Sequence, residues 1–266
     1  MNFFKTLLAG AATFVAAHTA SFSEAEADTV SDIVNRGALN IAVQTQGPPF
    51  SFVDKHGERT GFAVEVVKLI AQDMGVEIEF HDYEWKGLIP SLLAKKVDFI
   101  AADMTPTPQR ALQLNFTEPF YYSEVVAYTN GNSTAATWQD LNQEGVKIGV
   151  PQASSHVKFV RDNLPNATVV ELSGGSPAVA QALSVGRVDA GVTAREIAVQ
   201  FTREFEGVRV VDGVIVKSPL SFPVRPQDTH LQSWLNNWFR IKHADRTIER
   251  MLEYWVLTDA WEADHK

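Results

Sequence analysis

The chain has 266 residues, with 23 Lys and Arg, 32 Asp and Glu, and no cysteine. That length suits one large domain or two lobes, and 45% hydrophobic with 21% charged residues excludes a disordered, collagen-like or multi-span membrane protein. The absence of cysteine excludes disulfides, Fe–S clusters and a thiol nucleophile, and the net charge of −9 argues against nonspecific nucleic-acid binding.

The first 27 residues are expected to be a signal peptide. Lys5 precedes an apolar run, residues 7–17, that is too short to span a bilayer, and Ala25 and Ala27 place small side chains where a signal peptidase reads them. A buried N-terminal helix is the alternative, but the acidic residues 23–28 suit a core poorly. We therefore expect an exported protein of the bacterial periplasm, without a lipid anchor because no cysteine is available to carry one.

Strand and helix patterns alternate through the first half of the remaining chain. Strands are predicted at residues 39–43, 76–80 and 97–101, a helix at 62–74 that Gly75 ends, and a short helix at 88–94 with Pro90 in its first turn. The β-α-β-α-β order predicts a parallel, doubly wound sheet.

The same order restarts in the second half, which indicates two α/β lobes. Strands are predicted at residues 146–150, 168–171 and 188–192, and helices at 155–163, 177–185 and 197–205. The polar residues 129–137 are expected to link the lobes, with a second crossing near 214–219. Helices at 229–239 and 247–256 follow, and their residues Trp234, Trp238 and Trp255 are expected to pack in a core.

Five segments carry a resemblance to a known family. They are residues 61–62 (GF), 85–92 (WKGLIPSL), 95–110 (KKVDFIAADMTPTPQR), 115–121 (NFTEPFY) and 186–190 (GRVDA). In this order and spacing they resemble the family 3 periplasmic solute-binding proteins, the receptors of polar amino-acid ABC transporters. The resemblance runs from about residue 31 to about residue 253.

The resemblance implies the fold and the lobe boundaries. It implies an α/β, two-lobed periplasmic binding protein fold of type II, each lobe a doubly wound sheet, with a two-strand hinge. Residues 28–128 and 220–266 would form lobe 1 and residues 132–215 lobe 2, with hinge segments near 129–131 and 216–219. Ligand would be trapped between the lobes by hinge closure.

The same resemblance assigns the ligand's carboxylate to four residues. Arg110 would grip it with paired hydrogen bonds, and Thr105 would add a hydroxyl and an N–H. Ser154 and Ser155, at the start of a helix, would close the second lobe onto it. The alternatives are an exposed helix arginine and ordinary helix caps. Ala153 stands where many relatives have glycine.

The main departure from the family pattern is Ala194, beside Thr193 and before Arg195, where relatives carry an aspartate that pairs with the ligand's ammonium. A methyl group cannot neutralise a buried charge. Asp103 is a candidate substitute, or a loop aspartate that caps a turn. Arg195 could instead select a dicarboxylate, or be a solvated residue at a helix start.

Three further positions bear on the ligand. Trp85 matches an aromatic residue of the cleft and is equally consistent with a core position. Gln44 and Gln46 stand where relatives for basic amino acids carry acids, and Gly47 where some carry an aromatic ring, which weakens the case for lysine or arginine. The expected ligand-binding set is Arg110, Thr105, Asp103, Trp85, Ser154, Ser155 and Thr193.

These residues predict a noncatalytic receptor for a small carboxylate-bearing solute, an amino acid or derivative, that delivers it to an ABC permease. We expect a monomer with no cofactor, no metal and no nucleic-acid partner. A cyclohexadienyl dehydratase-like enzyme on the same fold, or a sensory or accessory binding protein, are the alternatives. The sequence has no HExxH, GxSxG, P-loop or GxGxxG motif.

Overall fold

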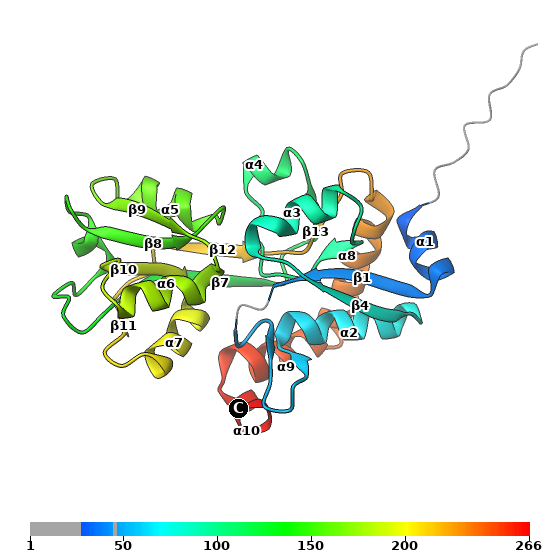
Figure 1. Ribbon diagram of the computed structural model, residues 1–266. Helices are drawn as coiled ribbons and strands as arrows, with labels where there is room; N and C mark the ends of the chain where they lie inside the picture. Colours follow the sequence, from blue (N-terminus) through cyan, green and yellow to red (C-terminus); the bar gives the residue numbers. More distant parts are fainter. Residues whose placement is uncertain (1–27, 45–46) are drawn as a thin grey trace, which may run out of the picture.

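The computed structural model describes residues 28–44 and 47–266, so the expected signal peptide lies outside the described residues. Figure 1 shows two α/β bodies side by side. One is built on a three-stranded sheet of order β4-β1-β5, and the other on a larger sheet of order β11-β7-β10-β8-β9, with β12 paired to β7. We call them the first lobe and the second lobe.

The first lobe has a short parallel sheet with helices on both faces. Strand β1 (Ala38–Val43) pairs in parallel with β4 (Glu77–Asp82) and β5 (Phe99–Ile100). Side chains alternate across a strand, so Ile41 and Val43 join one core cluster while Ala42 joins another. Both clusters are buried, which explains why this strand reads as a nearly continuous apolar run.

Helices α2 and α3 of this lobe differ in how well the sequence pattern predicted them. Helix α2 (Phe62–Met74) has the predicted bounds, and Gly75 ends it with a left-handed backbone at φ 70°. Helix α3 (Trp85–Leu93) begins three residues before the predicted start, so Pro90 lies inside the helix and the prediction of a first-turn proline is wrong. The first turn holds Lys86 and Gly87, which carry no apolar periodicity, so the pattern did not reveal it.

The second lobe repeats the architecture around a larger sheet. Strand β8 (Lys147–Pro151) pairs in parallel with β9 (Thr168–Leu172) and β10 (Ala190–Ala194). Its helices are α5 (His156–Asn163), α6 (Gly175–Ser184) and α7 (Arg195–Glu204). A separate core cluster, which includes Ile148, Val150 and Val192, fills the space between the sheet and α5.

Two antiparallel strands run between the lobes. Strand β7 (Tyr121–Thr129) pairs with β12 (Val216–Leu220), and residues 125–129 of β7 also pair with β10. Beyond β12, strand β13 (Pro223–Val224) pairs with β6 (Asn115–Phe116) back in the first lobe. The residue boundaries of the lobes and hinge stay a prediction.

The C-terminal region returns to the first lobe. It contains α8 (Thr229–Ala244), α9 (Thr247–Leu252), a π-helical turn (Glu253–Leu257) and α10 (Ala260–His265). The helix predicted over 247–256 is therefore shorter, because its last turn widens into the π turn. Trp238 and Trp255 are each 5% exposed and Trp234 packs against the same cluster, so their predicted core role is confirmed.

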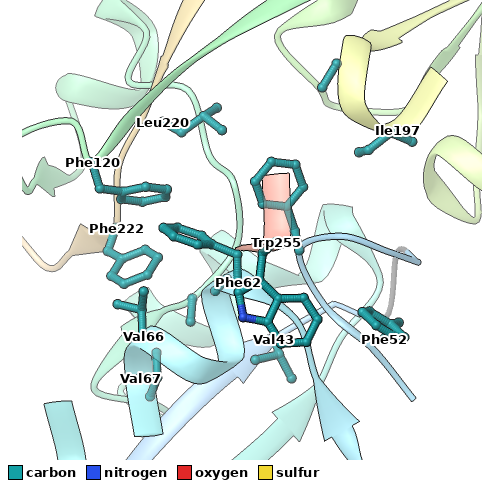
Figure 2. Packing of buried hydrophobic residues seen from close by; sticks show 14 of the residues in the cluster. Val43, Phe52, Phe62, Val66, Val67, Phe120, Ile197, Leu220, Phe222 and Trp255 are labelled. Atoms are coloured by element: carbon teal, nitrogen blue, oxygen red, sulfur yellow. The ribbon is translucent and has the colours of Figure 1, made fainter. Parts of the chain in front are cut away.

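An aromatic cluster joins these segments to α2. Figure 2 shows Phe62 of α2 close to Phe120, Phe222 and Trp255, which come from distant parts of the chain. Ring centroids are 5.6 Å apart for Phe62 and Phe120, and 4.9 Å for Phe120 and Phe222. The cluster holds the N-terminal ends of β7 and β13 against the first lobe. It therefore fixes the point at which the connecting strands leave the first lobe.

The remaining elements are short. They are α1 (Thr29–Arg36), β2 (Phe52–Val53), β3 (Arg59–Thr60), α4 (Pro108–Ala111), a 3₁₀ turn (Trp138–Leu141) and β11 (Arg209–Val210). Among residues 28–44 and 47–266, no helix combines the length and the apolar character that a membrane crossing requires.

Candidate ligand-binding site between the lobes

A pocket lies between the lobes, with about 480 Å³ of space that is partly open to solvent. The first lobe contributes Gln44, Trp85, Asp103 and Thr105. The connecting strands contribute Ser123, Val125, Ser218 and Leu220. The second lobe contributes Pro151, Ser154, Ser155, His156, Gly175, Ser176, Thr193, Ala194 and Ile197. The pocket is therefore lined by both lobes and by the strands that join them.

Six of the seven expected site residues line this pocket, namely Trp85, Asp103, Thr105, Ser154, Ser155 and Thr193. The seventh, Arg110, lines an adjoining open groove of about 1240 Å³. Ser154 and Ser155 line both spaces, so they form the wall between them. The structure thus brings all seven residues into one region and places Arg110 at its edge.

Arg110 is held by contacts to both lobes. Its Nη1 donates to the carbonyl oxygen of Thr105 at 2.8 Å, and its Nη2 donates to that of Ala153 at 3.2 Å. The guanidinium carbon lies 5.7 Å from the ring centroid of Trp85, at cation–π distance. Burial lowers the pKa of Arg110 to about 10, so the side chain stays charged at neutral pH.

Thr105 and Ser155 meet across the cleft. Ser155 Oγ donates to Thr105 Oγ1 at 3.3 Å, and Thr105 Oγ1 also bonds the hydroxyl of Ser218 at 2.7 Å. The cap of helix α4 is Thr107, whose Oγ1 accepts from the N–H of Arg110. Capping therefore does not explain the Thr105 side chain, which is left to the pocket.

The start of α5 has donors and a hydroxyl that face the same region. Ser155 occupies the N-cap position, yet its side chain makes no capping hydrogen bond. Ala153 has a left-handed backbone at φ 62°, a conformation that favours glycine. The turn directs the Ala153 carbonyl towards the first lobe, where Trp85 Nε1 donates to it at 3.3 Å. The N–H groups at this helix start suit an anion.

Asp103 supplies negative charge inside the pocket. Burial raises its pKa to about 6, and the nearby carboxylate of Glu196 adds to the shift. Glu196 is held in place, because Tyr121 Oη donates to it at 2.6 Å and Ser123 Oγ at 2.7 Å. Ala194 lines the pocket as a buried methyl group, so a second carboxylate stands two residues along the chain from the missing one.

Arg195 does not line either space. Its Nε pairs with Glu124 Oε2 at 2.7 Å and the side chain is 38% exposed, as expected for a solvated residue at a helix start. Arg195 therefore adds no cation to the pocket. The hydroxyl of Thr193 is already engaged in a hydrogen bond with Ser176 Oγ, at 3.0 Å within the second lobe.

Three buried polar atoms of the pocket have no hydrogen-bond partner among the described residues. They are Gln44 Oε1, Ser154 Oγ and His156 Nδ1. Burial, with a smaller effect of Arg110, lowers the pKa of His156 to about 4, so its ring is neutral at pH 7. An unsatisfied buried polar atom is costly, so these three atoms favour a polar occupant.

Sequence reasoning missed His156, Ser123, Ser218 and Glu196. His156 follows the expected serines directly and could have been included as a helix-start residue. Ser123 and Ser218 lie on β7 and β12, which the sequence pattern did not identify as a strand pair. Glu196 follows Ala194 on the next helix. No group of three or more His, Asp or Glu side chains in the described ranges has a geometry that could hold a metal ion.

Comparison with known proteins gives a family match and several related binding proteins. The model of the family "Bacterial extracellular solute-binding proteins, family 3" matches residues 39–258. The ABC transporter arginine-binding protein 1 of Escherichia coli is 30% identical, over 82% of this chain and 90% of its own length. The L-cystine-binding protein TcyJ of E. coli is 27% identical, over 89% of both chains.

Solved structures confirm the predicted fold class. The ancestral amino acid-binding protein AncCDT-1, described as a precursor of cyclohexadienyl dehydratase, superposes with a TM-score of 0.78 at 30% identity. The match covers 86% of this chain and 99% of that chain. An arginine-binding protein mutant from T. maritima gives a TM-score of 0.78 at 28% identity, over 86% and 100% of the two chains.

Proposed function

We propose that this chain, which belongs to the bacterial extracellular solute-binding proteins of family 3, is the substrate-binding component of an ABC importer for an amino acid or a derivative. The observation that carries the proposal is one interlobe pocket with an acidic group, Asp103, inside it and a guanidinium, Arg110, in the adjoining groove. The related chains named for arginine and cystine binding support the same class of ligand.

The ligand's carboxylate would bind where three groups converge. These are the guanidinium of Arg110, the hydroxyl of Ser154 and the N–H groups at the start of α5. A guanidinium offers two parallel N–H donors to a carboxylate. An ammonium group would face Asp103, with Glu196 behind it. The ligand would thus be bound as a zwitterion.

Closure follows from the position of these groups on different lobes. Arg110 and Asp103 belong to the first lobe, and Ser154 and Ser155 to the second. A ligand that contacts both sets binds the closed arrangement better than an open one, and it shifts the population by that difference in affinity. A permease that recognises the closed arrangement would then engage loaded receptor more often than ligand-free receptor.

A thermal-shift screen tests the proposal directly. The panel contains the common amino acids, their keto- and hydroxy-acid analogues, dicarboxylates and betaines. A ligand that binds only the native state raises the melting temperature by mass action. Hits among free α-amino acids support the zwitterion site. Hits confined to compounds without a primary amine would contradict the role given to Asp103.

A dehydratase activity is the second candidate, because one solved relative is described as a precursor of cyclohexadienyl dehydratase and because the pKa of Asp103 is raised to about 6. A carboxyl group with such a pKa can donate a proton near neutral pH. We nevertheless propose a noncatalytic receptor, since neither Ala194 nor Thr193 is an acid and Glu196, the nearby acid of the second lobe, does not line the pocket. Turnover of prephenate by the purified protein would reverse this assignment.

We further propose export through the signal peptide of residues 1–27 and a periplasmic location. N-terminal sequencing of the protein secreted by a Gram-negative host tests this, and a start at Asp28 is expected. The named relatives favour transport over a sensory or accessory role. The test is whether deletion of the gene abolishes solute uptake and whether its reintroduction restores uptake. Sedimentation tests the expected monomer.

A further inference from the structure

The C-terminal helix α10 is anchored on the first lobe by an aromatic contact. Trp261 is 1% exposed, and its ring stacks on Trp255 with centroids 6.2 Å apart. The edge of the Trp261 ring also meets Phe52 of the β2–β3 hairpin at 5.3 Å. This burial fixes the helix to the first lobe.

Polar contacts add to the same anchor. His265 Nδ1 lies 2.9 Å from Asp54 Oδ2. The backbone N–H of Lys55 donates to the His265 carbonyl at 3.1 Å, and Lys55 Nζ donates to the Ala263 carbonyl at 3.0 Å. The C-terminal half of α10 is therefore tied to the hairpin of the first lobe.

The opposite side of α10 contacts the second lobe. Arg203 of α7 donates to Asp259 through both terminal nitrogens, at 3.0 and 2.7 Å, and its Nη1 also pairs with Glu262. Lys266 Nζ adds a hydrogen bond to Gln200 Oε1 of α7 at 2.8 Å. Helix α7 packs on strands β7 and β10 of the second lobe, so these contacts join the two lobes.

The contacts of Arg203 have a geometry that single surface ion pairs lack. A fork-to-fork contact with one carboxylate and a second carboxylate on the same guanidinium form a network. The hydrogen bond from Arg203 lowers the pKa of Asp259, so both partners are charged at neutral pH. Asp259, Glu262 and Lys266 all lie beyond residue 258, where the match to the family model ends. The device is therefore carried by a segment outside the matched region.

We propose that α10 is an interlobe latch, in which Arg203 of the second lobe and the pair Asp259 and Glu262 of the first lobe bias the ligand-free protein towards the closed arrangement. The side chains of Arg203 and Asp259 are 39% and 59% exposed, so water and salt weaken the attraction. An exposed ion-pair network of this kind shifts the ratio of closed to open protein roughly two- to fivefold. It therefore changes the affinity for ligand without any contact to the ligand.

The test measures lobe separation in the ligand-free protein, so it does not depend on which ligand is found. Because the chain has no cysteine, spin labels can be placed at Leu112→Cys and Val185→Cys, which are 85% and 67% exposed on different lobes. Pulsed electron resonance then gives the distance distribution. Arg203→Ala is expected to raise the ratio of the longer-distance to the shorter-distance population roughly two- to fivefold. An unchanged distribution at low salt overturns the latch.

Two further variants separate the latch from a general effect of charge removal. Arg240→Ala removes an exposed arginine that pairs with Glu118 inside the first lobe, and it should leave the distribution unchanged. The double variant Asp259→Ala with Glu262→Ala should shift the distance distribution as much as Arg203→Ala does. Adding Arg203→Ala to this double variant should cause no further shift. Additive effects, or an equal shift in Arg240→Ala, would contradict the proposal. At about 1 M salt the difference from wild type should vanish.

Discussion

Ser155 of the second lobe donates a hydrogen bond to Thr105 of the first lobe at 3.3 Å, and the same Thr105 oxygen bonds Ser218 of β12 at 2.7 Å. Three hydroxyls from the two lobes and a connecting strand thus meet at one point of the pocket. Each hydroxyl can both donate and accept, so the trio can reorganise when a ligand enters. It couples the position of the lobes to the chemistry of the site.

Thr105→Ala should weaken ligand binding by about 1 kcal/mol or more, because it removes a partner from two buried hydroxyls as well as a contact to ligand. Thr105→Ser keeps the hydroxyl and should bind nearly as wild type. Isothermal titration calorimetry with a hit from the thermal-shift panel measures both. Equal loss in the two variants would mean that the methyl group, and not the hydroxyl, matters at this position.

Arg110→Ala should cost about 2–5 kcal/mol of binding free energy and leave the protein folded, because it removes a charge-assisted, paired contact from a half-buried position. Arg110→Lys keeps the charge but loses the fork and should fall between the two. The control is Arg240→Ala, far from the pocket in sequence and paired with Glu118. Near-native affinity in a folded Arg110→Ala variant would refute the carboxylate site.

Asp103→Asn should stabilise the ligand-free protein while it weakens ligand binding. The folded-state pKa of Asp103 is about 6 against an ordinary 3.8, so keeping this carboxylate ionised at pH 7 costs on the order of 1–3 kcal/mol. The amide carries no such cost, but it cannot neutralise an ammonium group. Chemical denaturation and calorimetry report the two effects separately. A destabilised variant would show that the carboxylate is structural.

Ligand binding should release a proton near pH 5. The raised pKa means that the folded, ligand-free protein binds this proton more tightly than the unfolded chain, so its stability falls as pH rises from about 4 to about 6. An ammonium ligand requires ionised Asp103, and affinity should therefore rise over the same interval and level off above it. Calorimetry in buffers of different ionisation enthalpy counts the proton, and Asp103→Asn should abolish its release.

Ala153→Gly should raise the stability by up to about 1 kcal/mol, because the left-handed backbone at φ 62° costs alanine about 1–2 kcal/mol and glycine recovers part of it. Arg246→Gly, at φ 62° before α9, is a matched control that should give a similar gain away from the pocket. Thermal melts compare them. If Ala153→Gly lowers the melting temperature while Arg246→Gly raises it, the Ala153 methyl group has a packing role.

The fold was predictable where buried positions recur at a regular spacing in the sequence. Helix α2 kept its predicted bounds because its apolar stripe is continuous and Gly75 stops it. Helix α10 left no such signal, since Trp261 is its only fully buried residue. Strand β7 was missed because polar and apolar residues alternate irregularly where it passes from one lobe to the other. Long-range pairing, not local preference, makes it a strand.

The site was predictable only through resemblance. No periodicity distinguishes Thr105 or Asp103 from other loop residues, whereas the motif that contains them marks the loop. The partners that the fold brings in, Ser218 and Glu196, lie far away in the sequence and carry no motif. Their roles depend on strand pairing between β7 and β12 and on the start of α7, which only the three-dimensional structure supplies.

The Ala153 carbonyl, which accepts from both Trp85 and Arg110, has a consequence for selectivity. In the ligand-free protein this oxygen acts as a built-in competitor for the guanidinium. The free energy that a solute gains from Arg110 is only the difference between two hydrogen bonds, the one to the solute's acceptor and the one to this neutral carbonyl. A carboxylate wins that exchange and a hydroxyl or an amide does not, so the chain screens out uncharged analogues before any side-chain recognition begins.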